Sequence, residues 1–362
     1  MQRKDLGIAI IGAGRIGTLR ATLAAAHPAV KFIAISDRDP LRAETLAKKV
    51  GAQFHTGDNL AAMSHPEVNA IVVSTIEMEH TEPVLQALAL GKPVLLEKPI
   101  AVDLDAADRI IDAAAKSGSS LHIGYSRRFK KRYLLAKEQI VQGRIGQITG
   151  TAARVYNSRS QAMQTLARLR PESNPVSGLT YYIDLMNWLL EGNEPVEIVA
   201  RGQRGVLKSM GHNAVDVAWV LITYADGAVA SLGVSYALPR LYPSLGHAAR
   251  VEVLGSEGVM LLDDDHTDQI MYSEQGADHV YIPEHRANMV FLGSGTPGDW
   301  ALGEFWGPVA TETRAWLDYL SMGRKCHLAT AQDARSVVEI TMAIEQSLRT
   351  RKPVELNGGV RP

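Results

Sequence analysis

The first third of the chain alternates short apolar runs with longer segments of helical periodicity. Short runs rich in Val, Ile and Leu, separated by helices, are typical of a parallel sheet covered on both faces. The predicted strands are Ile8–Ile11, Phe32–Ser36, Ala70–Ser74, Val94–Leu96 and His122–Tyr125. The predicted helices are Arg15–Ala26, Pro40–Val50, Thr81–Leu90 and Leu104–Ser117. Gly91 and Gly118 follow two of these helices, where a left-handed cap is expected.

Beyond about residue 125 the pattern changes to longer strands joined by tight turns. Two turn sequences, Ala225-Asp226-Gly227 and Ser256-Glu257-Gly258, predict hairpins. Their strands are Val217–Tyr224, Ala228–Tyr236, Val251–Leu254 and Val259–Leu262. Helices are predicted over Gly178–Leu190, Gly303–Ser321 and Ala331–Thr350. Gln161–Val176 and His279–Asp299 are predicted as long loops, which in compact domains often act as functional lids.

We therefore predict two domains. A chain of 362 residues exceeds one average domain. The alternating part, residues 1–125, is expected to be a doubly wound α/β domain, and residues 126–362 an α+β domain. The last helix could return to pack on the first domain.

Composition narrows the class of protein. Lys and Arg number 38 and Asp and Glu 39, so a net charge of −1 indicates neither a nucleic-acid-binding nor a membrane surface. No apolar run approaches the ~20 residues of a transmembrane helix. The first strand begins by residue 8 and leaves no room for a signal peptide, so a cytoplasmic location is expected. Cys326 is the one cysteine, which excludes intramolecular disulfides and thiolate zinc clusters.

A Gly-x-Gly-x-x-Gly turn follows the first strand directly. Gly12 permits the tight turn, Gly14 lets phosphates approach the backbone, and Gly17 lets the helix pack closely on the strand. Such a turn binds a dinucleotide pyrophosphate through N–H groups at the helix N-terminus. Arg15 and Ile16, between the last two glycines, belong to the same predicted cofactor site.

Asp37 lies 20 residues beyond Gly17, at the end of the second strand, where an acidic side chain can bind the ribose hydroxyls. Its carboxylate would repel a 2′-phosphate, which favours NAD over NADP. Arg38 is the opposing signal, because a guanidinium can bind that phosphate and stack on adenine.

Glu97-Lys98-Pro99 ends the fourth strong strand, at the sheet edge where open α/β proteins bind ligands. A lysine there can donate to a substrate oxygen and favour its alkoxide. Pro99 restricts Lys98 to an extended conformation, and a cis bond would aim the side chain differently. The alternative is a surface lysine before a turn proline.

These motifs together resemble the glucose–fructose oxidoreductase/inositol dehydrogenase/MocA (Gfo/Idh/MocA) family. The resemblance extends over the whole chain, in consistent order. The motifs that carry it are Gly12/Gly14/Gly17, Asp37, Ser74-Thr75-x4-His80, Glu97-Lys98-Pro99, Gly124-Tyr125-Ser126-Arg127-Arg128-Phe129, Gly143-x-Ile145-Gly146 and Asp184-x3-Trp188.

The resemblance implies a Rossmann domain and a C-terminal domain with a large open sheet, which is often a dimer or tetramer contact. It implies NAD(P)-dependent hydride transfer at a carbinol carbon, with the nicotinamide near Lys98. The residues expected at the cofactor also include Ser74, Thr75, His80, Glu97 and Arg128, and Arg127 and Tyr156 are expected at the substrate. A buried, satisfied polar residue at a helix end is the alternative for His80.

The chain departs from the family pattern on the helix that faces the nicotinamide. Inositol dehydrogenase-type members carry Asp-x3-His-x2-Asp there, and alignment on Asp184 places Ser177 at the first Asp and Tyr181 at the His. Family members that resemble glucose–fructose oxidoreductase and dihydrodiol dehydrogenases have Tyr at that position. Tyr181 is therefore the candidate for proton transfer, with Lys98 lowering its pKa from about 10. Ser177 would bind substrate or cap the helix, and Asp184 would touch substrate or fix the helix.

Two charged clusters allow more than one interpretation. The first cluster is basic, and it either forms a solvated face or binds an anionic substrate. Its members are Arg127, Arg128, Lys130, Lys131, Arg132, Arg154, Arg159, Arg168 and Arg170. Asp263-Asp264-Asp265-His266 lacks a second spaced His and is predicted to be a solvated turn. We predict no metal site.

The function predicted from these features is an NAD-dependent oxidoreductase acting on a secondary alcohol or ketone of a small polyhydroxylated substrate. A sugar, cyclitol, sugar acid or cyclic dihydrodiol fits. Two alternatives from the same resemblance are an NAD-dependent glycosidase with transient oxidation and a non-catalytic dinucleotide sensor.

Overall fold

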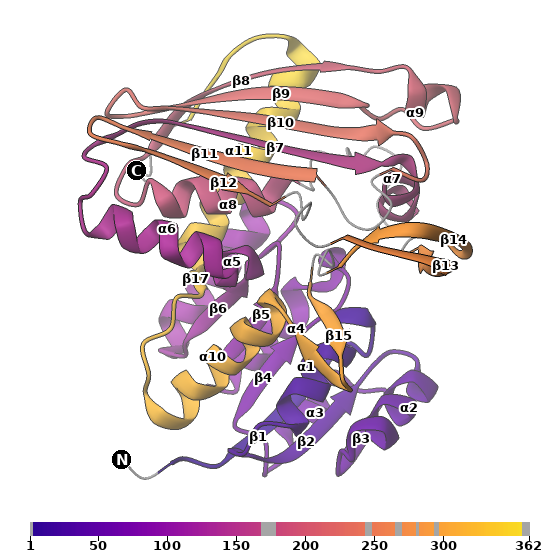
Figure 1. The fold of residues 1–362 in the computed structure, drawn as a ribbon. Helices are drawn as coiled ribbons and strands as arrows, with labels where there is room; N and C mark the ends of the chain where they lie inside the picture. The colour runs from indigo at the N-terminus through magenta and orange to yellow at the C-terminus, as the bar shows by residue number, and fades with distance from the viewer. Residues whose placement is uncertain are drawn as a thin grey trace. The chain divides into compact units, whose positions relative to one another are not determined.

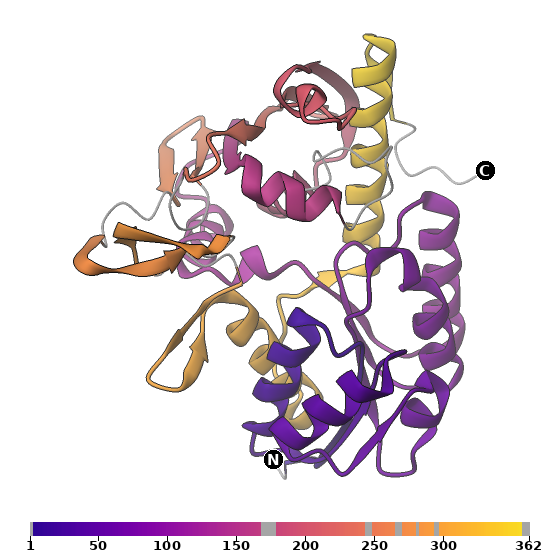
Figure 2. The ribbon, with the colours of Figure 1, turned by 90° about the vertical axis from the view of Figure 1, so that its right-hand side faces the viewer.

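The computed structural model describes residues 3–167, 179–242, 248–264, 270–279, 282–292 and 297–356. Within the chain, two compact units are distinguished by their internal contacts (Figures 1 and 2). The first comprises the chain up to Lys130 together with Trp300–Val338, and the second comprises Lys131–Asp299 and the chain from Glu339 onward.

The first unit is built on a seven-stranded sheet in the order β17-β6-β5-β4-β1-β2-β3. All pairs are parallel except β17 with β6. The strands are β1 (Leu6–Ile11), β2 (Val30–Ser36), β3 (Phe54–Thr56), β4 (Ala70–Val73), β5 (Val94–Glu97), β6 (Leu121–Gly124) and β17 (Ala329–Thr330). Every residue of β1, β4 and β5 is buried, as a sheet covered on both faces requires.

Helices cover both faces of this sheet. They are α1 (Arg15–Ala25), α2 (Pro40–Val50), α3 (Asn59–Ser64), α4 (Thr81–Ala89), α5 (Leu104–Ser117), α10 (Pro308–Met322) and the start of α11 (Ala331–Thr350), with 3₁₀ turns η1 (Glu77–Glu79) and η2 (Ser126–Phe129). Gly91 and Gly118 take φ values of 68° and 66°, so both predicted left-handed caps are confirmed. The late helix α10 packs on α1, and Trp316 and Leu317 join the core formed by β1 and β2.

The second unit is built on a seven-stranded sheet in the order β12-β11-β7-β10-β9-β8-β18. Only β7 and β10 pair in parallel, so the described sheet is mostly antiparallel. Its strands are β7 (Ile148–Ser158), β8 (Pro195–Gln203), β9 (Val217–Tyr224), β10 (Val229–Leu238), β11 (Ala248–Gly255), β12 (Val259–Asp263) and β18 (Val354–Glu355). The predicted fold class, a Rossmann sheet plus an open, mostly antiparallel sheet, is confirmed.

One face of the second sheet is covered and the other is open. Helices α6 (Lys131–Val141), α7 (Arg159–Leu166), α8 (Thr180–Leu189), α9 (Val206–Ser209) and most of α11 belong to this unit. On the covered face the hydroxyl of Ser347 in α11 accepts the Ala200 N–H (2.9 Å), and Tyr224 donates to Asn187 of α8 (3.0 Å). Along β9, buried residues alternate with the exposed Trp219 and Leu221.

Three predicted elements were wrong in part. The first predicted loop began at Gln161, but residues 161–166 belong to α7, which is capped by the Ser158 hydroxyl. The second predicted loop contains β14 (Ile282–Phe291), which pairs with β13 (Ile270–His279). The helix predicted from Gly303 begins at Pro308, because Glu304–Trp306 pairs as β16 with β15 (Asp299–Ala301), and Gly307 turns at φ 119°.

None of the helices in these described ranges has both the length and the apolar character needed to cross a membrane.

Candidate functional site

The glycine turn joins β1 to α1 and leaves no room for side chains at two of its three glycines. Gly12 has φ 98°, and a Cβ there would lie 2.7 Å from the Ser74 carbonyl oxygen. A Cβ on Gly17 would overlap the Gly12 carbonyl oxygen. At Gly14 no atom lies within 4 Å of such a Cβ, so this backbone faces open space. The turn is thus closed on the protein side and open where a pyrophosphate would approach.

The first N–H groups of α1 have no side-chain cap and face the same space. Its N-cap, Gly14, has no side chain to satisfy the first N–H groups, and Arg15 is exposed while Ile16 is half-buried. Next to the turn, the buried Ser74 hydroxyl has no hydrogen-bond partner among the described residues. An uncapped helix N-terminus with a glycine cradle and an unpartnered hydroxyl fits a dinucleotide phosphate.

Asp37 lies beside the glycine turn. Its Oδ2 accepts the Ala13 N–H (2.8 Å), and its Oδ1 accepts the Asp39 N–H (2.9 Å). Arg38 forms an ion pair with Glu79 (2.8 Å). Because Glu79 offsets the Arg38 charge, the opposing signal for a 2′-phosphate is weakened and the charge argument favours NAD.

A groove of about 720 Å³ opens beside these residues. Arg38, Thr75, Met78 and Glu79 are among the side chains that line it. It lies next to the position expected for the ribose, so these residues would hold the adenosine half of the cofactor.

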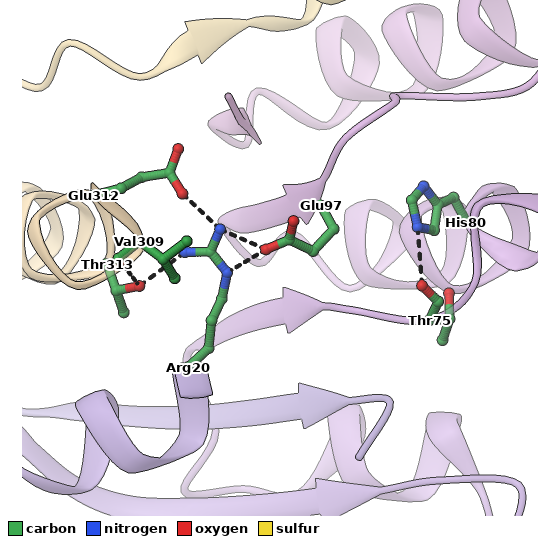
Figure 3. Close-up of polar contacts among 7 residues, drawn as sticks. All are labelled: Arg20, Thr75, His80, Glu97, Val309, Glu312 and Thr313. Atoms are coloured by element: carbon green, nitrogen blue, oxygen red, sulfur yellow. Dashed lines mark hydrogen bonds and ion pairs between the residues drawn. The ribbon is translucent and has the colours of Figure 1, made fainter. Parts of the chain in front are cut away.

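His80 is engaged by the protein at both ring nitrogens. Nε2 lies 3.3 Å from the Thr75 carbonyl oxygen (Figure 3). Nδ1 lies 2.8 Å from the Pro99 carbonyl oxygen. Burial lowers the His80 pKa, although both carbonyls and Glu97 oppose the effect. The neutral ring has one N–H, and the shorter distance assigns it to Nδ1, donating to Pro99. These contacts agree with the alternative of a satisfied residue at a helix end.

Glu97 is the last residue of β5 and is buried, and Lys98 and Pro99, which follow it, are half-buried. The Lys98–Pro99 bond is cis. Because it directly follows the last residue of β5, Lys98 lies at the carboxyl edge of the parallel sheet, the edge to which Gly12 and Ser74 also belong.

The two arginines of η2 are buried, with 2% and 3% of their surfaces exposed for Arg127 and Arg128. Arg128 Nη1 binds Asp333 at the start of α11 (3.2 Å). Other members of the basic group also have protein partners: Arg132 contacts the Asp263 carbonyl and Asp264, and Arg159 donates to the Leu238 carbonyl. Arg168 and Arg170 lie outside the described residues. These contacts account for Arg128, Arg132 and Arg159 without an anionic ligand.

In the second unit, α8 carries Tyr181 near its start, half-buried, and Asp184, fully buried. Ser177 lies outside the described residues. Tyr156, on β7, is half-buried, and the Arg154 guanidinium lies 5.1 Å from its ring centre. The sequence analysis did not single out the next residue, Asn157, whose buried Oδ1 has no hydrogen-bond partner among the described residues. The strand that carries Asn157 has no clear alternating pattern, so the sequence offers no local signal for this residue.

The prediction of a solvated turn at the acidic run was wrong for Asp264. This side chain is fully buried, 3.4 Å from both the Tyr133 hydroxyl and Arg132 Nη1. Asp265 and His266 lie outside the described residues. Within the described ranges no group of acidic, His or Cys side chains is arranged to hold a metal.

Cys326 is partly buried, and this burial raises its pKa to about 11. A thiol with that pKa is almost entirely protonated near neutral pH, so it is not an activated nucleophile.

Comparison with known proteins identifies the family. Residues 6–125 match the model described as "Oxidoreductase family, NAD-binding Rossmann fold", and residues 137–356 match "Oxidoreductase family, C-terminal alpha/beta domain". The chain belongs to the Gfo/Idh/MocA family. It is an oxidoreductase, and the predicted family and the predicted NAD cofactor are confirmed.

Relatives of this Gfo/Idh/MocA chain include proteins named for inositol oxidation. A myo-inositol 2-dehydrogenase of Thermotoga maritima is 30% identical over 74% of this chain and 79% of its own. An inositol 2-dehydrogenase of Rubrobacter xylanophilus is 26% identical over 70% of each chain. The fold matches a scyllo-inositol dehydrogenase of Lactobacillus casei, solved with NAD(H) and scyllo-inositol, with a TM-score of 0.78, 20% identity, and coverage of 97% of this chain and 99% of that one.

Proposed function

We propose that this chain is an NAD-dependent dehydrogenase that oxidises a secondary alcohol of a cyclic polyol to the ketone. The curated relatives named as inositol 2-dehydrogenases carry this proposal. The glycine cradle beside Asp37 and the lysine at the sheet edge support it.

We assign the chemistry to residues as follows. When bound, NAD supplies the hydride acceptor. Gly12, Gly14 and Gly17 with the N-terminus of α1 hold its pyrophosphate, and Asp37 binds its ribose. The Lys98 ammonium donates to the reacting oxygen and stabilises the developing alkoxide. The Tyr181 side chain, as the phenolate, accepts the proton of that oxygen and becomes the phenol.

Asp184 follows Tyr181 by three residues on α8, so the two share a helix face. Its complete burial favours the interpretation that it fixes the helix rather than touching substrate. Its contribution to catalysis is then indirect.

The test of this function is NADH formation with inositols, sugars, sugar acids and cis-dihydrodiols, each with NAD or NADP. We expect turnover with an inositol and a preference for NAD of about tenfold or more, the ratio produced by about 1.4 kcal/mol of charge repulsion. If no compound of this panel gave NADH, the result would contradict the proposal. In that case, release of a leaving group without NADH indicates the glycosidase, and tight NAD binding without either activity indicates the sensor.

We also propose that the open face of the second sheet joins copies of this chain. Its exposed side chains include Trp219 (52%), Leu221 (47%) and Leu261 (70%), which is a large apolar surface for a monomer. Light scattering should give a multiple of 39.3 kDa. Leu221→Glu should reduce the mass of the particle. Leu41→Glu, at an exposed position on α2, should leave the mass unchanged. A wild-type particle with the mass of one chain would exclude the proposal.

A further inference from the structure

A fully buried arginine ties together three segments of the first unit. Arg20 lies on α1, and its Nε and Nη2 are both 2.5 Å from Glu97 Oε1 (Figure 3). Nη2 also donates to Glu312 Oε2 (2.6 Å), and Nη1 donates to Thr313 Oγ1 (2.8 Å). The guanidinium therefore joins the end of β5 to α1 and α10.

The charges of Arg20, Glu97 and Glu312 fix how these three side chains lie relative to one another. Burial by itself would lower the Arg20 pKa, but the carboxylates of Glu97 and Glu312 reverse this effect and hold it above its usual value. Buried charges are tolerated only when partners satisfy their hydrogen-bonding groups, and the planar fork of Arg fixes the direction of each bond. Glu97 thus has little freedom to move.

Gly124 provides the room for this guanidinium. It lies opposite Glu97 in the pairing of β5 with β6. A Cβ on Gly124 would lie 2.7 Å from Arg20 Nη2 and 3.5 Å from Glu97 Oε1. Gly124 is not among the glycines with positive φ, so the close approach of Arg20, rather than backbone conformation, explains the glycine.

Lys98 lies between two neighbours that are both anchored. On one side Glu97 is held by Arg20, and on the other the Pro99 carbonyl accepts the His80 N–H (2.8 Å). Both anchors come from other elements of the first unit: α1 for Arg20 and the start of α4 for His80.

We infer that Arg20, acting through Glu97, is a positioning residue for Lys98, with His80 as the second anchor. This inference rests on the proposed role of Lys98. The two anchors hold the backbone of Lys98 at the sheet edge, so that its ammonium meets the reacting oxygen without rearrangement. Displacement by an ångström is enough to lower a catalytic rate substantially.

The first test is Arg20→Lys, which keeps the charge and loses the fork. We expect kcat to fall about 10- to 100-fold with the KM for NAD unchanged. In the Lys98→Ala background the same change should lower kcat less than about twofold, because its effect passes through Lys98. Equal losses in both backgrounds, or an unchanged kcat in a folded Arg20→Lys protein, would overturn the inference.

Arg335→Lys is the matched control. Arg335 of α11 binds Asp108 of α5 through two nitrogens (2.6 and 3.3 Å) in the same unit. Arg335→Lys should lower Tm without lowering kcat.

Gly124→Ala is a second probe. It keeps every charge and crowds Arg20, so it should reproduce the kcat loss. His80→Leu should also lower kcat, and His80→Gln, which can still donate to Pro99, should recover part of it; no difference between these two would count against the second anchor.

A measurement without substrate distinguishes this inference from the proposed reaction. The ¹³C resonance of the reductively methylated Lys98 amine, assigned by its absence in Lys98→Ala, should shift in Arg20→Lys and not in Arg335→Lys. An unchanged resonance contradicts the positioning role. A shifted resonance in a protein that oxidises no polyol supports the positioning role and removes the proposed function instead.

Discussion

Lys98→Ala is expected to lower kcat by about 10²- to 10⁴-fold, the range for losing a group that exchanges or stabilises charge on a reacting oxygen. Lys98 follows β5 at the carboxyl edge of the sheet, and its ammonium is the proposed partner of the developing alkoxide. The glycine cradle is expected to bind the pyrophosphate through backbone N–H groups, which this substitution leaves in place. NAD binding, measured by fluorescence titration, should therefore remain within about threefold of wild type.

The control for this prediction is Lys116→Ala. Lys116 is an exposed lysine on α5 in the same unit. Its removal takes away the same charge from the protein and should leave kcat unchanged. If Lys98→Ala retained full activity, the assignment of the electrostatic role to Lys98 would be wrong. If it lost NAD binding and activity together, Lys98 would be a cofactor ligand instead.

Tyr181→Phe is expected to lower kcat by about 10²-fold or more, since the phenol hydroxyl is the proposed proton-exchanging group. The substitution removes one oxygen from a half-buried side chain and leaves the ring, so α8 should keep its packing. Steady-state kinetics should show the loss in kcat with little change in the KM for NAD. Removal of a pH-dependent limb from the kcat profile would identify the missing titrating group.

Tyr182→Phe tests whether the alignment of this helix is correct. Tyr182 is the next residue, is buried (1% exposed) and points to a different face of α8. We expect it to affect stability rather than kcat. Full activity of Tyr181→Phe with loss in Tyr182→Phe would move the catalytic role by one residue. Full activity of both would exclude a tyrosine of α8 as the proton-exchanging group.

The elements predicted correctly are those whose pattern is local. Pro40–Val50 and Leu104–Ser117 agree with α2 and α5 to the residue, because each helix has a capping aspartate and ends at a left-handed glycine. The five first-domain strands and the Val217–Tyr224 strand of the hairpin also follow from apolar runs bounded by turns. These signals lie within a few residues of the element that they define.

The elements that were missed lack such signals. The strand β7 runs through Thr, Gly and Ala residues, whose weak alternation predicts no strand, yet it becomes central because β10 and β11 pair on either side. The hairpin of β13 and β14 contains polar residues at many positions, and pairing between its strands decides its structure. Strand propensity depends strongly on such neighbours, which are distant in the sequence.

The candidate site likewise combines residues that local motifs reveal with residues that only contacts between distant segments reveal. The glycine turn, Asp37 and Glu97-Lys98-Pro99 could be recognised because their chemistry lies in contiguous residues. The interaction of Arg20 with Glu97 and Glu312 could not, because these residues lie 77 and 292 positions from Arg20. Arg20 occupies a helix in which a charged residue ordinarily faces solvent.

The sequence alone therefore determined the fold class, the family and the cofactor, because patterning and contiguous motifs act over a few residues. Only the tertiary structure decided that Arg38 pairs with Glu79, that Asp264 is buried, and that Arg20 and His80 anchor the two neighbours of Lys98. Burial and ion pairing depend on which distant segments meet. A charge that looks solvated in the sequence becomes a buried contact once another element covers it.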